Sequence, residues 1–261
     1  MNNDAFMAHI SNIPPLESIR PAPLSEHPSS DMIVPASAAV AGQGIIGFVE
    51  GISRQAREDV LDTFTYATLA ADKRYNVVSQ NGAWYKVFRE VMTRALHWTP
   101  QDVAYTSYSS RERVLSMDKI GLDLLASSLA AAGATAATGG AASPLVLQVA
   151  GDAVKALKEN PAPLRLFDGR TKKPNGARFM VGGCRESQDG VIVLAVGAVE
   201  MKTQITTGHV LFLNWNSVSL DLQRSADVFV FHQSLHALRR DRVRAALSSS
   251  ADAAFLDFPI Y

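Results

Sequence analysis

The chain has 261 residues, of which 47% are hydrophobic and 19% charged, enough for the core of one large domain or two small ones. Lys and Arg together number 25, as do Asp and Glu, and this zero net charge argues against a general nucleic-acid binder, which needs a basic surplus. The single cysteine excludes an internal disulfide, cannot by itself form a zinc site, and is typical of a reducing compartment.

The first 36 residues are rich in proline and serine and lack the periodic apolar pattern of a folding unit. We therefore predict a flexible arm over residues 1–36 and a single domain over residues 37–261. The N-terminus also lacks the basic start and the apolar run of a secretory signal peptide.

Helical periodicity begins near Ser53. Apolar stripes predict a first helix there and a second helix over about residues 83–97, which Pro100 closes. A short strand over 103–109, a helix from Ser116 and a helix over 145–157 follow. The two stripes consist of Val60, Phe64, Ala67 and Ala71, and of Trp84, Val87, Phe88, Val91 and Ala95.

Residues 124–151 contain no charged side chain, but they are dominated by Ala, Ser, Thr and Gly and are interrupted by Gly139, Gly140 and Pro144. A membrane-spanning helix needs roughly 20 strongly apolar residues. We therefore interpret this stretch as two amphipathic helices joined by a loop of small residues.

Strand patterns dominate after Leu164. Residues 177–184, a turn at 188–190 and residues 191–202 predict a hairpin, and residues 206–214 and 217–222 continue as a meander. Residues 191–199 are apolar at odd and even positions, so both faces of the sheet must be covered. With a final helix over about 231–247, we predict an α+β fold: a helical N-terminal half packed around a C-terminal antiparallel β-sheet covered on both faces.

The segment Gly42–Gly47 fits the pattern G-x-G-x-x-G, with Asp62 about 20 residues further on. A dinucleotide-binding fingerprint needs a strand before this pattern and a second strand after the next helix. Residues 64–73 look helical where that second strand should begin. We therefore interpret the glycines as a flexible entry to the first helix.

His232 and His236 lie four residues apart, a spacing that places two imidazoles on one face of a helix and suits two metal ligands. Gln233 stands where the zinc-protease pattern needs Glu, and an amide cannot act as a general base. Folding could bring His209 to them, but we predict no metal site and interpret both as surface histidines.

The only cysteine, Cys184, ends a predicted buried strand and follows Gly182 and Gly183, which remove side-chain bulk beside it. It can be read as a small hydrophobe of the core. It can also be read as the nucleophile of an enzyme, with His209 as its base, although no signature of a known cysteine protease surrounds it.

The order and spacing of several segments resemble the Erwinia virulence factor (Evf) family of bacterial proteins. The resemblance runs from about Asp59 to Leu247, nearly the whole folded part of the chain. It rests on residues 60–71, Trp84-Tyr85 with Phe88, Leu96-His97-Trp98, residues 179–184, residues 197–203, residues 210–212 and residues 239–247.

This resemblance implies a compact α and β fold that carries a palmitate or similar fatty acid, linked as a thioester to a cysteine in an apolar environment. Cys184 is the position that matches, with Gly182 and Gly183 leaving room for the first carbons of the chain. The apolar helix faces around Phe64, Phe88, Val91 and Leu125 are expected to line the rest of the chain. It implies a lipoprotein used in bacterial virulence or persistence, a toxin-like effector that is not an enzyme apart from self-acylation.

The implied partners are a fatty acyl donor such as acyl-CoA and a host membrane or host protein, with no nucleic acid. We expect synthesis in the bacterial cytoplasm without a signal peptide, followed by export along a non-classical route or by membrane association. The alternative is an acyl-transferring or thioester-cleaving enzyme, in which Cys184 carries the acyl group transiently and His209 is the base.

Overall fold

The structure, a computed structural model, describes residues 34–78, 82–103, 114–132, 142–203, 205, 207–216, 222–250 and 254–260. Ile33–Tyr261 form one compact unit. Of the arm predicted over residues 1–36, residues 34–36 lead into the first strand and the others lie outside the described residues.

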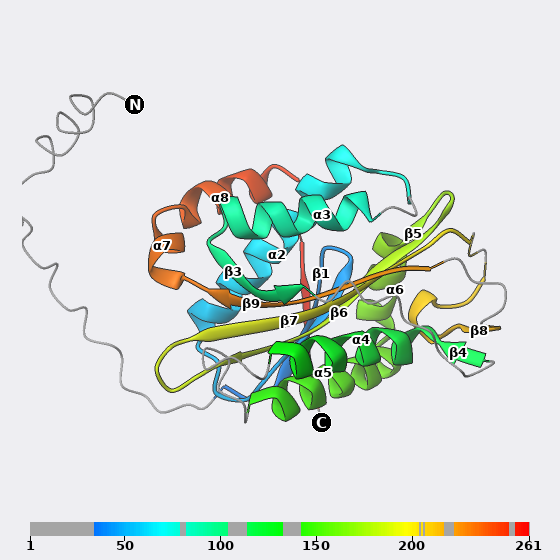
Figure 1. Ribbon diagram of the computed structural model, residues 1–261, viewed down its shortest axis with the longest axis horizontal. Coiled ribbons are helices and arrows are strands. Elements are labelled where there is room, and N and C mark those ends of the chain that lie inside the picture. The colour runs from blue at the N-terminus through cyan, green and yellow to red at the C-terminus, as the bar shows by residue number, and fades with distance from the viewer. Residues whose placement is uncertain are drawn as a thin grey trace, which may run out of the picture. The chain divides into compact units, whose positions relative to one another are not determined.

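An eight-stranded mixed sheet forms the centre of the described structure, in the order β10-β1-β2-β6-β7-β9-β3, with β5 paired to the start of β6 (Figure 1). Strands β2 and β6 pair in parallel, and the other neighbours pair antiparallel. The strands are β1 (Ser37–Ala41), β2 (Gly44–Phe48), β3 (Trp98–Val103), β5 (Lys172–Lys173), β6 (Gly176–Glu186), β7 (Ile192–Met201), β9 (Leu222–Phe231) and β10 (Leu256–Pro259). A separate ribbon pairs β4 (Val114–Ser116) with β8 (Asn214–Asn216).

Helices cover both faces of this sheet, as Figure 1 shows, which confirms the predicted α+β fold. The α2 layer consists of α2 (Arg54–Arg74), α3 (Ala83–Glu90), the π-helix η2 (Val91–Ala95), α7 (Gln233–Ala237) and α8 (Arg240–Ser248). The α4 layer consists of α4 (Met117–Ala132), α5 (Ala142–Glu159), α6 (Pro161–Thr171) and the 3₁₀-helix η4 (Val210–Phe212). No helix in the described ranges is both long and apolar enough to cross a membrane.

Helix α2 forms because its sequence caps its start and supplies one continuous apolar face. Ser53 is the N-cap, and its hydroxyl accepts a hydrogen bond from the backbone N–H of Ala56 at 3.3 Å. The predicted stripe of Val60, Phe64, Ala67 and Ala71 is completely buried on the sheet. These residues place α2 directly over the face of β6 that carries Cys184.

Two glycines let α5 approach the opposite face closely. Gly47 of β2 and Gly183 of β6 are partners in the parallel register. A Cβ atom at Gly183 would lie 2.2 Å from the carbonyl oxygen of Val146, and one at Gly47 would lie 2.3 Å from that of Val149. The absence of a side chain at these two positions therefore lets the backbone of α5 pack directly against the sheet.

The glycine-rich segment 42–47 belongs to a β-hairpin, so its interpretation as a flexible entry to the first helix was wrong. It forms the turn between β1 and β2 and the second strand itself, with Gly42 at φ 52°. A Cβ at Gly44 would lie 2.7 Å from the ring of Phe64 on α2. The pattern thus serves turn formation and packing under α2, without the strand–turn–helix context of a dinucleotide site.

Several other expectations need correction. The sheet is not confined to the second half, because β1, β2 and β3 come from the first, and Pro100 lies inside β3. Pro161 starts helix α6 where strands were expected, since proline is favoured in the first helical turn. Where the first strand of the meander was expected, the chain forms η4 and the start of β8, whereas residues 217–221 of the second expected strand lie outside the described residues. The long strand β9 follows, and the final helix divides into α7 and α8. Most of the strand predicted over 103–109 lies outside the described residues.

The close approach of α5 makes a specific stability prediction. Gly183→Ala and Gly47→Ala should each lower the free energy of unfolding by about 1–3 kcal/mol, because a methyl group would press on a helix backbone. Urea unfolding followed by circular dichroism measures this change.

Gly151→Ala is the matched control on α5 itself, since a Cβ there meets nothing within 4 Å. This control should raise stability by up to about 1 kcal/mol through helix propensity. An equal change in the free energy of unfolding for all three variants would contradict the packing argument.

Candidate functional site

Cys184 lies near the end of β6, where its side chain faces the α2 layer. Its neighbours across the sheet are Phe48 of β2 and Leu194 of β7. All three side chains are completely buried in one apolar cluster, which also contains Phe64 of α2. The only thiol of the chain therefore lies in a layer from which water is excluded.

This environment suppresses the chemistry of the thiol. Burial strongly raises the pKa of Cys184, and the negative charge of Glu186 raises it further. Glu186 itself accepts a hydrogen bond from the backbone N–H of Ser53, at 2.7 Å, and so lies at the start of α2. The thiolate is the nucleophilic form, so Cys184 is unreactive while the α2 layer is closed.

The structure separates the two glycines that were predicted to support an acyl site. Gly182 shares the face of Cys184, and a Cβ there would lie 3.6 Å from Ile46 and 3.7 Å from Leu194. Gly183 faces the α4 layer, and α5 occupies the space beside it. Gly183 therefore leaves no room on the face of the sheet that carries Cys184.

Four apolar residues were expected to line an acyl chain, and the sheet divides them in the same way. Phe64 and Phe88 belong to the cluster that contains Cys184, and Val91 packs against that cluster. Leu125 belongs to the α4 layer on the other face. A chain attached to Cys184 in the α2 layer can therefore meet the first three residues but not Leu125.

His209 and Cys184 are not brought together. His209 precedes η4, whose Val210 and Leu211 are buried in the α4 layer. Nδ1 of the half-exposed His209 ring donates to the carboxylate of Asp168 at 2.5 Å, and the same carboxylate accepts the backbone N–H of Val210. The Asp168–His209 pair therefore fixes the start of η4.

The two histidines with ligand spacing also have separate surroundings. His232 is exposed, and its Nε2 lies 2.8 Å from the hydroxyl of Thr99. His236 is completely buried on α7, which corrects its interpretation as a surface residue. Among the described residues, no group of three or more His, Cys, Asp or Glu side chains could hold a metal ion.

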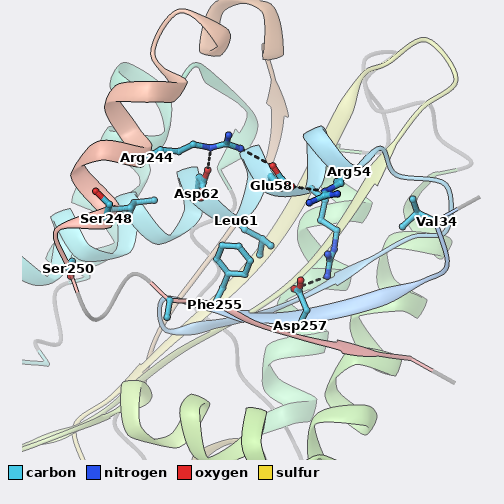
Figure 2. Close-up of a pocket in the computed structure, with 13 residues that line it drawn as sticks. Val34, Arg54, Glu58, Leu61, Asp62, Arg244, Ser248, Ser250, Phe255 and Asp257 are labelled. Carbon is cyan, nitrogen blue, oxygen red and sulfur yellow. Dashed lines mark hydrogen bonds and ion pairs between the residues drawn. The ribbon is translucent and has the colours of Figure 1, made fainter. Parts of the chain in front are cut away.

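A groove of about 960 Å³ lies beside the α2 layer, bounded by α2, by the end of α8 and by the chain that enters β10 (Figure 2). Leu61 and Leu247 line it and also belong to the apolar cluster that contains Cys184. Arg57 lines it as well, and its guanidinium lies 5.1 Å from the ring centre of Phe48, the strand neighbour of Cys184. The groove therefore shares side chains with the cluster that contains the buried thiol.

Ion pairs join the walls of this groove. Arg244 of α8 binds Asp62 and Glu58 of α2, each at 2.9 Å (Figure 2). Arg57 of α2 binds Asp257 of β10 at 2.7 Å. The groove thus has paired charges along its edges, and α8 is one of its walls.

Two carboxylates that sequence analysis did not single out, one half-buried and one fully buried, tie the α2 layer together. Asp72, near the end of α2, accepts hydrogen bonds from Gln43, Trp84, Lys173 and the fully buried Arg178. The only local signal for this network was the presence of charged residues at otherwise apolar positions, such as Arg178 within β6.

A second such carboxylate lies on β9. The fully buried Asp227 accepts hydrogen bonds from Tyr85 and Arg89 of α3, at 2.9 and 3.1 Å. Burial raises the pKa of Asp227, and these two donors partly offset that rise because they stabilise the charged carboxylate. The carboxylate therefore attaches α3 to the sheet.

Comparisons with known proteins give little guidance. No family model matches the chain, and no curated protein matches it. A solved structure described as a delta-endotoxin aligns with a TM-score of 0.33 and 7% identity, over 81% of this chain and 89% of that one. This similarity is too low to support a functional conclusion, so the resemblance to the Evf family stays an expectation from the sequence.

The burial of Cys184 predicts its reactivity. In native protein with a free thiol, a maleimide should label Cys184 at least about a hundredfold more slowly than in denaturant, because opening of the α2 layer must come first. Mass spectrometry over time measures this rate.

Gln188→Cys in a Cys184→Ser background supplies the control, since residue 188 is exposed in the turn after β6. That thiol should be labelled at similar rates in both conditions. Rapid native labelling of Cys184 would show that the α2 layer does not protect it.

Proposed function

We propose that the protein is a lipoprotein carrying one fatty acyl group, palmitate or a similar chain, as a thioester on Cys184. We further propose that it serves bacterial virulence or persistence, as the resemblance to the Evf family implies. The observation that carries the proposal is the placement of the only thiol of the chain, fully buried in the apolar α2 layer.

The energetics of this site favour a stably held chain. Burial of a sixteen-carbon chain at about 0.8 kcal/mol per methylene supplies roughly 10 kcal/mol. The aromatic side chains of Phe64 and Phe88 offer apolar contacts on the same face as Cys184. Because water is excluded from this layer, a thioester there is also protected from hydrolysis.

The attachment step is a thioester exchange. The Cys184 thiol loses its proton to solvent, and the thiolate attacks the carbonyl carbon of an acyl thioester such as acyl-CoA. A carbon–sulfur bond forms, and the bond to the donor sulfur breaks with its electron pair on that sulfur, which then takes up a proton. One thioester replaces another, so the step needs no ATP. It must occur while the α2 layer is open, because the thiol is buried when the layer is closed.

The enzyme alternative receives less support from the geometry. His209, its proposed base, pairs with Asp168 beside the α4 layer, and Cys184 faces the α2 layer. A transient acyl carrier also needs a thiol that ionises readily, and burial has the opposite effect on Cys184. These observations favour a static acyl carrier over a turning-over enzyme.

Intact-mass measurement tests the proposal. Protein purified from a bacterial host should carry the additional mass of one fatty acyl group, and neutral hydroxylamine should remove it because hydroxylamine cleaves thioesters. Cys184→Ser should be folded, by circular dichroism, and should have the unmodified mass.

An unmodified wild-type mass would contradict the proposal, as would added mass that persists on Cys184→Ser. Wild-type protein whose adduct disappears on incubation, but persists in His209→Ala, would support the enzyme alternative. Asp168→Asn controls for disruption of η4, since it weakens the same contact without removing the imidazole.

A further inference from the structure

A buried histidine lies on α7, the short helix that connects β9 of the sheet to α8. His236 of α7 has no exposed surface, and neither of its ring nitrogens has a hydrogen-bond partner among the described residues. Its ring packs against Phe231 at the end of β9, with ring centres 5.2 Å apart, and Phe231 stacks on Trp98 at 4.3 Å. The imidazole thus occupies an apolar position.

The nearest carboxylate is already saturated with donors. Asp59 of α2 is completely buried and receives two hydrogen bonds from Arg240, at 2.6 and 2.7 Å. Gln55 and Gln233 also donate to it, at 3.0 and 3.5 Å. A proton on His236 would therefore compete with Arg240 for Asp59 and would gain no free acceptor there.

The other charged and titratable groups around His236 are basic. Arg240 and Arg244 of α8 and His97, which precedes β3, all disfavour a second positive charge at this position. His97 itself adopts φ 63°, and its carbonyl accepts the backbone N–H of His232. Arg239 and His232 act on His97 in the same direction. Among the described residues that act on His236, Asp59 alone favours the proton.

We propose that His236 is an acid-sensitive switch. Its protonation releases α7 and α8 from α2 and opens the groove that lies between α2 and α8. The inference goes beyond the proposed acyl site and does not depend on it. Its basis is the enclosure of an unpartnered imidazole between a saturated carboxylate and a group of arginines.

The direction of the pH effect follows from the burial. Desolvation lowers the pKa of His236 in the folded protein below its ordinary value of 6.5. The unfolded or released state therefore binds the proton more readily than the closed state. Closure is fully favoured above about pH 6.5 and loses free energy as the pH falls from there towards the folded pKa.

Release of α8 would change the groove directly. Arg244 and Leu247 of α8 line it together with Leu61 and Asp62 of α2, and Figure 2 shows Arg244 paired with Asp62. Burial raises the pKa of Asp62, so its ion pair with Arg244 is lost at higher pH than for an ordinary aspartate. Further acidification therefore acts in the same direction as the protonation of His236.

Amide hydrogen exchange of the full chain, read by mass spectrometry and corrected for the intrinsic chemical rate, tests the switch. Between about pH 7.5 and about pH 5, peptides from α7 and α8 should exchange about tenfold faster, because protonation of His236 favours the released state. Peptides from α4 and α5 should keep their protection. Cys184→Ser should respond as the wild type does, which keeps this test separate from acylation.

His236→Phe and His236→Met should abolish the acceleration at about pH 5, because they fill the apolar position without a titratable group. Two variants are used so that the test can still be read if one of them fails to fold. His232→Gln is the matched control, an exposed histidine four residues earlier, and should retain the response. The proposal is overturned if a folded His236 variant responds to acid like the wild type, or if the acceleration spreads equally over α4 and α5.

Discussion

The seating of α2 on the sheet is the contact on which the rest of the structure depends. Its apolar stripe covers the β1–β2 hairpin and β6, and its polar anchors lie near its two ends. Asp59 binds Arg240 of α8 near the start of the helix, and Asp72 binds Arg178 of β6 near its end. Asp59 and Arg178 are the fully buried members of these pairs, and loss of either one's partner would leave an uncompensated buried charge, a cost that exceeds the net value of the pair. These anchors therefore fix the position of the helix along the sheet, which nonpolar packing alone specifies less sharply.

This seating also decides the chemistry of Cys184. A thiol at the same position of an exposed strand would ionise and react, whereas under α2 it is a small buried hydrophobe with a raised pKa. The core and the acyl interpretations are therefore compatible, because the same exclusion of water that makes the thiol inert would preserve a thioester once it had formed. What separates them chemically is whether the layer opens long enough for a donor to reach the thiol.

The sequence predicted the features that depend on local periodicity. The stripe of α2, the hairpin of β6 and β7, and the covering of both sheet faces followed from apolar spacing, because burial selects those residues directly. It failed where tertiary contacts override the local signal. The glycines at 42, 44 and 47 looked like a flexible entry, and only the positions of α2 and α5 explain them. Gly183 was assigned to the acyl site although alternation along β6 already places it on the face opposite its neighbour Cys184. The face that Leu125 covers depends on how α4 packs, which no local pattern shows.

The charged residues of the candidate site were the hardest to predict, because ion pairs form between segments far apart in the chain. Asp59 and Arg240 are separated by 181 positions, and nothing in either neighbourhood indicates the other. Arg240 of α8 and Asp59 of α2 both act on His236, so this pair joins the two helices beside the imidazole.

The two ends of α2 consequently differ in their surroundings. Near Asp72 the donors Gln43, Trp84, Lys173 and Arg178 surround one carboxylate. Near Asp59 the carboxylate is equally well bound, but a neutral base is enclosed beside it and its protonation adds a charge that the closed arrangement cannot compensate. Protonation of His236 therefore acts on the end of α2 that α8 covers, whereas the network around Asp72 attaches the other end to the sheet.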